Sequence, residues 1–245
     1  MDSFASVADL ILLASGAFAA SILAAVAGFG GAAVLLPLLV ASFGVREAIP
    51  ILTVAQLFGN LSRVWFNRRD LDLAVVGWFA LTGVPAALIG GFLFASAPLP
   101  LLTRLLGIFL IGVVIYRRAA SGSTKRLPLR AFAIVGAVFS FLSALLGSVG
   151  PIMIPFFLAY GLVKGALIGT EALATVVMHV SKLVAYGSSA VLTNHSVTVG
   201  LGLGLIMILG SLIGKNILDR LPEKIFIFLI EATLLIAGIR FLIYG

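Results

Sequence analysis

The stretch AGFGGAAVLLPLLVASF, residues 27–43, decides the fold of this chain. Its glycine cluster, residues 28–31, is followed by a short apolar run that cannot cross a bilayer, because a crossing helix needs about 20 residues. The stretch GSVGPIMIPFFLAYGL, residues 147–162, repeats this design in the second half of the chain. Interrupted hydrophobic segments at matching places in two halves indicate the binding site of a secondary transporter.

The composition predicts an integral membrane protein that is all-α. Of the 245 residues, 62% are hydrophobic and 10% are charged, against about 25% charged in an average protein. Backbone groups in lipid need partners within their own segment, so the chain must be almost entirely helical. Apolar residues run unbroken, as in Leu105–Val114, whereas the strands of a β-barrel alternate polar and apolar positions.

We expect a polytopic protein built from two related halves, each with a short segment after a glycine break. The first half has apolar segments at 8–27, 32–43, 48–66, 73–95 and 99–118, and the second at 130–146, 152–162, 166–187, 196–217 and 222–244. Matching features include Pro37 with Pro155, and Ser62-Arg63 with Ser181-Lys182. The repeats are predicted at 1–120 and 127–245, joined by a basic cytoplasmic linker at 117–130.

Loop charges predict that the second half is inverted relative to the first. If the short segments count as crossings, nearly all loop lysines and arginines fall on one side, with Arg46 and Arg240 on the other. Positive loops remain cytoplasmic, so both termini are expected outside. This rule also accounts for the formal charge of +7, and nucleic-acid binding is rejected.

Polar stripes on the third segment of each half are candidate binding residues. Their members recur at steps of three or four residues, which places them on one helical face. They are Thr53, Gln56, Asn60 and Arg63 in the first half, and Glu171, Thr175, His179 and Lys182 in the second; Thr170, next to Glu171, is a further candidate. An unpaired charge at the bilayer centre costs about 3 kcal/mol, so such residues face a cavity or a partner. The alternatives are that Arg63 lies at the cytoplasmic interface and that Glu171 and Lys182 pair with other helices.

The glycine breaks form the second set of candidates. A helix that begins within the membrane presents free N–H groups and its positive dipole end, which together receive an anion without a charged side chain. The residues of these breaks are Gly28, Gly30, Gly31, Gly147, Ser148 and Gly150. In contrast, the four-residue spacings Gly200/Gly204 and Gly210/Gly214 are typical of helix packing.

Other chemistries have little support in the sequence. Two histidines and no cysteine predict no metal site, and no cofactor motif is present. A cation or metal transporter that uses Glu171 as a ligand is one alternative function. An intramembrane hydrolase that uses Ser148 and His179 is another, although Gly147-Ser148-Val149-Gly150 does not match a nucleophile elbow.

The motif Ala27-Gly28-Phe29-Gly30-Gly31 with Pro37 and Thr53 to Asn60, repeated as Gly147 to Pro155 and Gly169-Thr170, resembles the TauE/SafE family of sulfite exporters. The resemblance covers essentially the whole chain. It implies a transporter rather than an enzyme, which exports sulfite, sulfoacetate or related organosulfonates through the bacterial inner (plasma) membrane. Its partners would be a small anion and the lipid bilayer, and a homo-oligomer is compatible with the sequence.

Two departures from the family pattern concern coupling. A small hydroxyl residue commonly follows the Gly-Thr pair, where this chain has Glu171, and an amide residue is common near His179. These changes could add proton coupling or alter the substrate, so that protons are a candidate coupling ion beside simple anion uniport. The expected mechanism is rocking of one half against the other around an anion held near Lys182, His179 and Arg63.

Overall fold

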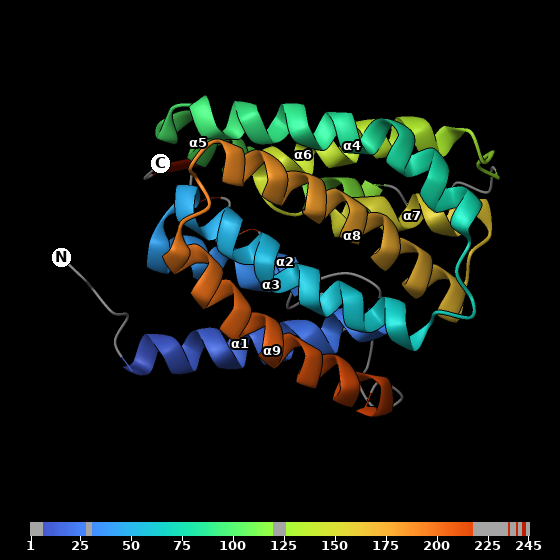
Figure 1. The fold of residues 1–245 in the computed structure, drawn as a ribbon, viewed down its shortest axis with the longest axis horizontal. Helices are drawn as coiled ribbons and strands as arrows, with labels where there is room; N and C mark the ends of the chain where they lie inside the picture. The colour runs from blue at the N-terminus through green and yellow to red at the C-terminus, as the bar shows by residue number, and fades with distance from the viewer. Residues whose placement is uncertain are drawn as a thin grey trace.

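The computed structural model describes residues 7–27, 31–119 and 126–217, together with residues 235, 239, 242 and 243. These residues contain nine α-helices and no strand, so the prediction of an all-α chain is confirmed (Figure 1). The helices are α1 (Val7–Ala27), α2 (Gly31–Phe43), α3 (Val45–Phe66), α4 (Leu73–Ser96), α5 (Leu99–Ala119), α6 (Ala131–Leu146), α7 (Gly150–Tyr160), α8 (Lys164–Ser188) and α9 (Asn194–Ile217). Most of the tenth predicted segment, 222–244, lies outside the described residues, as does part of the linker.

Local sequence explains where the helices begin and end. The short helices α2 and α7 both end at glycines with positive φ, Gly44 at 73° and Gly161 at 112°, a conformation that costs little only for glycine. Because the break falls at Gly44, α3 begins at Val45, slightly before the predicted segment. The start of α4 is fixed by Asp72, whose carboxylate accepts hydrogen bonds from the N–H groups of Ala74 and Val75.

The helices form two bundles, and each bundle borrows one helix from the other half of the chain. In the first bundle α1 and α3 pack against α9, and α2 packs against α1 and α3; in the second, α6 and α8 pack against α4, and α7 contacts α6 and α8 (Figure 1). There are two hydrophobic core clusters. One includes Leu13, Leu36 and Leu52 of the first bundle and extends across α5 to Phe94 and Tyr186 of the second, and the other, with Phe79, Phe132 and Phe157, lies within the second bundle. The two halves of the sequence are therefore interlocked rather than side by side.

Glycines allow α9 to approach the first bundle closely. A β-carbon added at Gly200 would lie 2.6 Å from Cβ of Val54 on α3, and one at Gly214 would lie 2.8 Å from the carbonyl oxygen of Ile22 on α1. Larger side chains would separate these helices. The predicted packing role of the α9 glycines is confirmed.

Each short helix turns back along the helix that precedes it. Gly16 of α1 lies beside Leu38 of α2, and Gly31 at the start of α2 lies beside Ala24, so the two helices are antiparallel. In the second half, the Leu127 N–H donates to the Ala159 carbonyl at 3.0 Å, which joins the end of α7 to the start of α6. Consequently, α2 and α7 begin inside the molecule and end at opposite ends of it. An inverted repeat would produce this arrangement, although the inverted relation remains a prediction.

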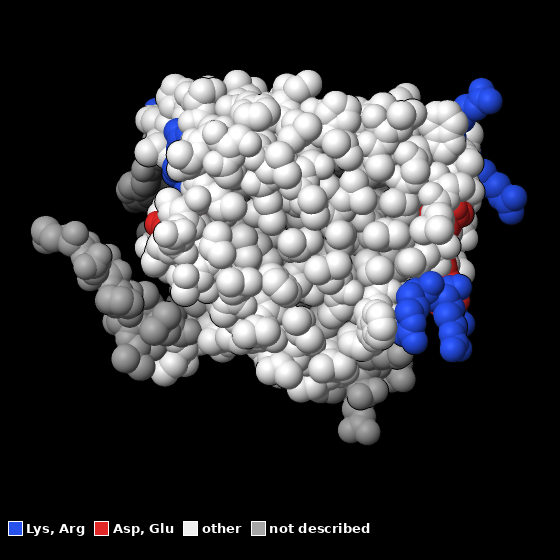
Figure 2. Space-filling view, in the orientation of Figure 1, with Lys and Arg blue, Asp and Glu red and all other residues white. Residues whose placement is uncertain are grey.

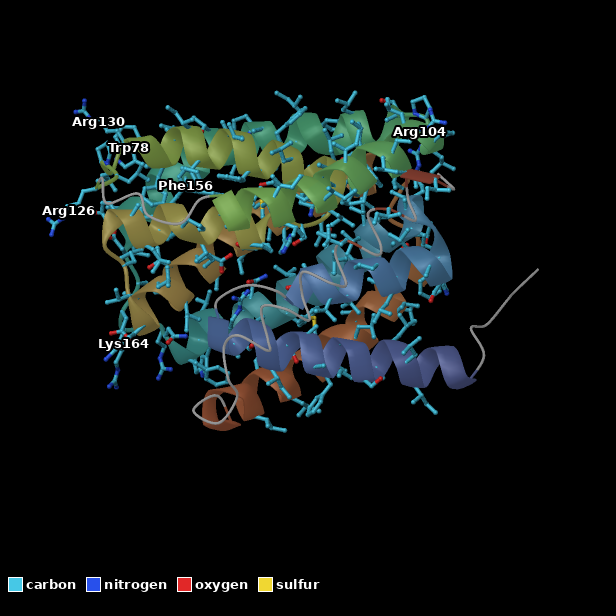
Figure 3. The ribbon with its side chains drawn as sticks, turned by 180° about the vertical axis from the view of Figure 1, so that it is seen from behind. Trp78, Arg104, Arg126, Arg130, Phe156 and Lys164 are labelled. Carbon is cyan, nitrogen blue, oxygen red and sulfur yellow. The ribbon has the colours of Figure 1, made fainter. Side chains whose placement is uncertain are left out.

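The surface is that of a membrane protein. Large apolar side chains are exposed along the helices, among them Trp65 and Ile134, and α4, α8 and the Asn194–Gly214 part of α9 are long and apolar enough to cross a membrane. Figure 2 shows a broad surface without charged residues between charged groups at the two ends. In Figure 3, Arg126, Arg130 and Lys164 lie at one end and Arg104 at the other. The cytoplasmic location of the first of these ends and the outside location of both termini remain predictions from the positive-inside rule.

Candidate functional site

A cavity of about 40 Å³ lies between the two bundles, at the point where α2 and α7 begin. On this measure it holds about three water molecules, which is comparable to a small oxyanion. The first half contributes Ala24, Gly31, Ala32, Gln56, Asn60 and Arg63, and the second half contributes Ser143, Gly147, Ser148, Val149, Gly150, Met153, Glu171, Thr175, Met178 and His179. Most of the residues predicted from the stripes and glycine breaks therefore meet at one place.

The centre of the cavity wall is an ion pair between α3 and α8. Nη1 of Arg63 lies 3.4 Å from Oε2 of Glu171, and both side chains are buried, at 5% and 2% exposure. Arg63 also donates to the side-chain oxygen of Asn60 and to the carbonyl of Ala24, and Thr175 donates to Oε1 of Glu171 at 3.1 Å. Arg63 is thus not an interfacial side chain, whereas the alternative that Glu171 pairs with another helix is correct.

Two polar groups of the cavity have no partner. Among the described residues, Nε2 of Gln56 and Nδ1 of His179 are buried without a hydrogen bond. A buried donor left unpaired costs roughly 1–3 kcal/mol. Both side chains line the cavity, so a ligand with acceptor oxygens would remove this cost.

The starts of the short helices add backbone donors. No side chain caps α7 at Val149. Pro151 has no N–H, and the N–H groups of Ile152 and Met153 donate to the Val149 carbonyl, so the donor that the first turn of α7 can offer is the N–H of Gly150. Gly147 has a φ of 87°, which a side chain rarely adopts, and a β-carbon at Gly31 would lie 2.8 Å from the Ala20 carbonyl. Gly28 and Gly30 lie outside the described residues.

Lys182 lies behind the cavity wall and not in it. Its fully buried ammonium donates to Oγ of Ser143 at 3.2 Å and to the carbonyl of Gly147 at 3.3 Å. One turn later, the Tyr186 hydroxyl donates to the Ala144 carbonyl at 2.6 Å. The last carbonyls of a helix attract cations, so Lys182 stabilises the end of α6 just as Arg63 contacts Ala24 in the last turn of α1.

Two other predicted residues are bonded elsewhere. Thr53 donates to the Ile49 carbonyl at 2.7 Å on its own helix, and Thr170 accepts a hydrogen bond from the Asp72 N–H at 2.9 Å. Neither residue lines the cavity. Ser143 was missed from the sequence; its position four residues before Gly147, within the last turn before a glycine break, was the available signal.

The charges near the cavity favour an anion over a cation. Two cationic side chains, Arg63 and Lys182, lie at or behind its wall, with Glu171 as the one carboxylate among the lining residues. The positive ends of two helix dipoles add to this balance.

Comparison with known proteins gives one result for nearly the whole chain. The model of the family described as Sulfite exporter TauE/SafE matches residues 12–241. No curated protein and no solved structure matches the chain.

Proposed function

Since the chain belongs to the TauE/SafE sulfite exporter family, a family of transporters and not of enzymes, we propose that it is a secondary transporter that exports small sulfur-containing anions such as sulfite, sulfoacetate or a related organosulfonate. The membrane proposed is the bacterial inner membrane. The observation that carries the proposal is the cavity between the bundles, where two interrupted helices begin beside unpaired donors.

Anion binding would use three kinds of donor. The guanidinium of Arg63 supplies charge, the side chains of Gln56 and His179 supply nitrogen atoms that have no hydrogen-bond partner among the described residues, and the start of α7 supplies the backbone amide of Gly150. Sulfite and sulfonates present three oxygens around one sulfur, so donors converging from several directions suit them. The buried setting strengthens each of these contacts.

Alternating access would involve the two bundles instead of the two sequence halves. The cavity lies at the boundary between the bundles, with α3 on one side and α8 on the other. Each of α4 and α9 packs against helices of the other sequence half. If one half rocked as a rigid unit, α4 and α9 would lose these contacts. Movement of the first bundle against the second would open the cavity toward either side of the membrane.

The alternatives agree less well with the geometry. A cation in the cavity would meet the guanidinium of Arg63, and the Glu171 carboxylate is already paired with it. For a hydrolase, the histidine base needs an acceptor on its second nitrogen, and Nδ1 of His179 has no partner among the described residues.

The test is efflux from proteoliposomes loaded with labelled sulfite, thiosulfate or sulfoacetate. We expect efflux above that of empty liposomes, and a roughly tenfold higher KM in Gln56→Leu, because one hydrogen bond to the anion is lost. Ser62→Ala is the matched control, since Ser62 is a buried polar residue on the same helix that bonds to the Gly59 carbonyl. Absence of efflux for all three anions would exclude the proposed function.

A further inference from the structure

The cavity proposed to receive an anion contains a carboxylate of its own. Glu171 lines the cavity, is 2% exposed, and lies 3.4 Å from the guanidinium of Arg63. An anion that enters this buried space meets a like charge where repulsion is poorly screened. Thr175 holds the second carboxylate oxygen, so Glu171 is fixed beside the binding space.

We propose that Glu171 is the proton-binding group of this transporter and that each anion is carried together with one proton. This inference rests on the proposed function. In the empty protein the ionised carboxylate pairs with Arg63 in the place that the anion will take. A proton from the solution on the open side binds to Glu171, weakens that pairing, and allows Arg63 to bind the oxygens of the anion.

The charge balance supports this exchange. Without substrate, Arg63 and Glu171 form a neutral pair; with a monovalent anion and a proton bound, the positive guanidinium, the neutral acid and the anion have the same total charge. A cavity in lipid that keeps its charge constant avoids the cost of an unpaired charge in either state. On the far side the anion and the proton are both released, and the ion pair forms again.

Few other groups can influence Glu171. Arg63 faces it from α3, while His179 and Lys182 follow it by about two and three turns on α8. The bounds of α2, α4 and α6 contain no titratable side chain, Tyr160 lies at the far end of α7, and Asp72 lies beside the neighbouring Thr170. Arg63 favours ionised Glu171 in the empty protein, and an arriving anion offsets this effect. Arg63 and Lys182 both oppose protonation of His179, which makes Glu171 the better proton carrier.

The direction of the pH effect follows from this linkage. If binding of the anion takes up one proton, a lower pH strengthens binding. Above the range in which Glu171 is protonated, KM for the anion should rise by up to tenfold for each pH unit. Efflux should also be insensitive to membrane potential for a monovalent anion, because no net charge moves.

The experiment measures proton and anion movement together in liposomes that contain a pH-sensitive dye and a monovalent organosulfonate, so that one proton per anion cancels the charge that is moved. Glu171→Gln, which keeps the shape of the protonated acid, should move one proton fewer per anion than the wild type. Any proton that the anion itself carries is the same for both proteins, so it cancels when the two values are subtracted. Its efflux should become independent of pH and respond to a potassium diffusion potential. Glu47→Gln is the control, because Glu47 is a carboxylate of α3 that pairs with His195 outside the cavity.

Three results would overturn the proposal: equal proton movement in wild type and Glu171→Gln, loss of the proton in His179→Gln instead, or efflux of the monovalent anion by the wild type that follows the membrane potential. The last measurement needs no variant, so a Glu171→Gln protein that fails to fold does not prevent a decision. Failure of the proposed function is distinct, since it appears as absence of anion efflux in the wild type.

Discussion

At the residue scale, Arg63 and Glu171 depend on each other. They lie 108 positions apart in the sequence, and each is buried against the other between two helices. Loss of one partner from a buried ion pair leaves an uncompensated charge, whereas replacing both by apolar residues is often neutral. The pair is therefore a site where effects on stability and on transport can be separated.

We predict that Arg63→Leu lowers the free energy of unfolding in detergent by roughly 3–5 kcal/mol. The double variant Arg63→Leu/Glu171→Leu should recover most of that loss, because no buried charge is left unpaired. Neither variant should export anions, since both lack the guanidinium. Thermal unfolding measures the stability of each variant, and proteoliposome efflux measures its transport. The control is Arg68→Leu, which replaces an exposed arginine beyond the end of α3. A double variant that transports normally would show that Arg63 does not bind the anion.

The sequence predicted which residues lie at the cavity better than it predicted their partners. Spacing along a helix places Gln56, Asn60 and Arg63 on one face, because the helical repeat is a local property. It contains no information on which side chain of a distant helix faces them, so the pairing with Glu171 was left as one of two alternatives. Lys182 was expected to contact the anion, but its side chain points toward the end of α6, where it donates to the Gly147 carbonyl. Spacing along the helix does not fix the direction of a single side chain this closely.

At the element scale, the glycine breaks position the site. Gly147 has a φ of 87°, and a β-carbon there would approach Ile49 and Leu36 at 3.3 Å. The break lets α6 stop and α7 begin inside the molecule, which directs the first turn of α7 at the cavity. The sequence predicts this element well because a positive φ strongly favours glycine. The sequence did not predict that α4 packs with the second half of the chain and α9 with the first. Long apolar helices have similar sequences on all their faces, so the sequence does not show which helix each one packs against.

We predict that Gly147→Ala destabilises the protein by roughly 1–3 kcal/mol, since alanine is strained in this backbone conformation. Gly77→Ala is the matched control: Gly77 lies within α4, has ordinary helical dihedral angles and has open space around it. That control should be neutral or stabilising by about 0.5–1 kcal/mol, because alanine is the better helix former. Equal unfolding temperatures for the two variants would contradict the role given to Gly147.

At the scale of the whole molecule, the two bundles contact each other toward both ends of the molecule. On one end, Arg46 of the first bundle donates to the carbonyls of Phe94, at 2.9 Å, and Ala97, at 2.6 Å, at the end of α4 in the second. On the other end, Asn67, just after α3, lies beside Gly165 at the start of α8. Transport by relative movement of the bundles requires these contacts to open in turn.

The chain contains no cysteine, so this movement can be tested by cross-linking in the otherwise natural sequence. We predict that a short reagent joining Asn67→Cys to Gly165→Cys abolishes efflux, because it ties the bundles together at the end of the molecule where α8 begins, and that a cleavable form of the reagent restores efflux after reduction. The control pair, Glu47→Cys and His195→Cys, lies within the first bundle, where the side chains are 2.6 Å apart. Cross-linking there should leave efflux unchanged, since α3 and α9 move together. Full transport by the first pair while cross-linked would exclude bundle movement, and the cavity would then have to exchange its anion through local opening of the short helices.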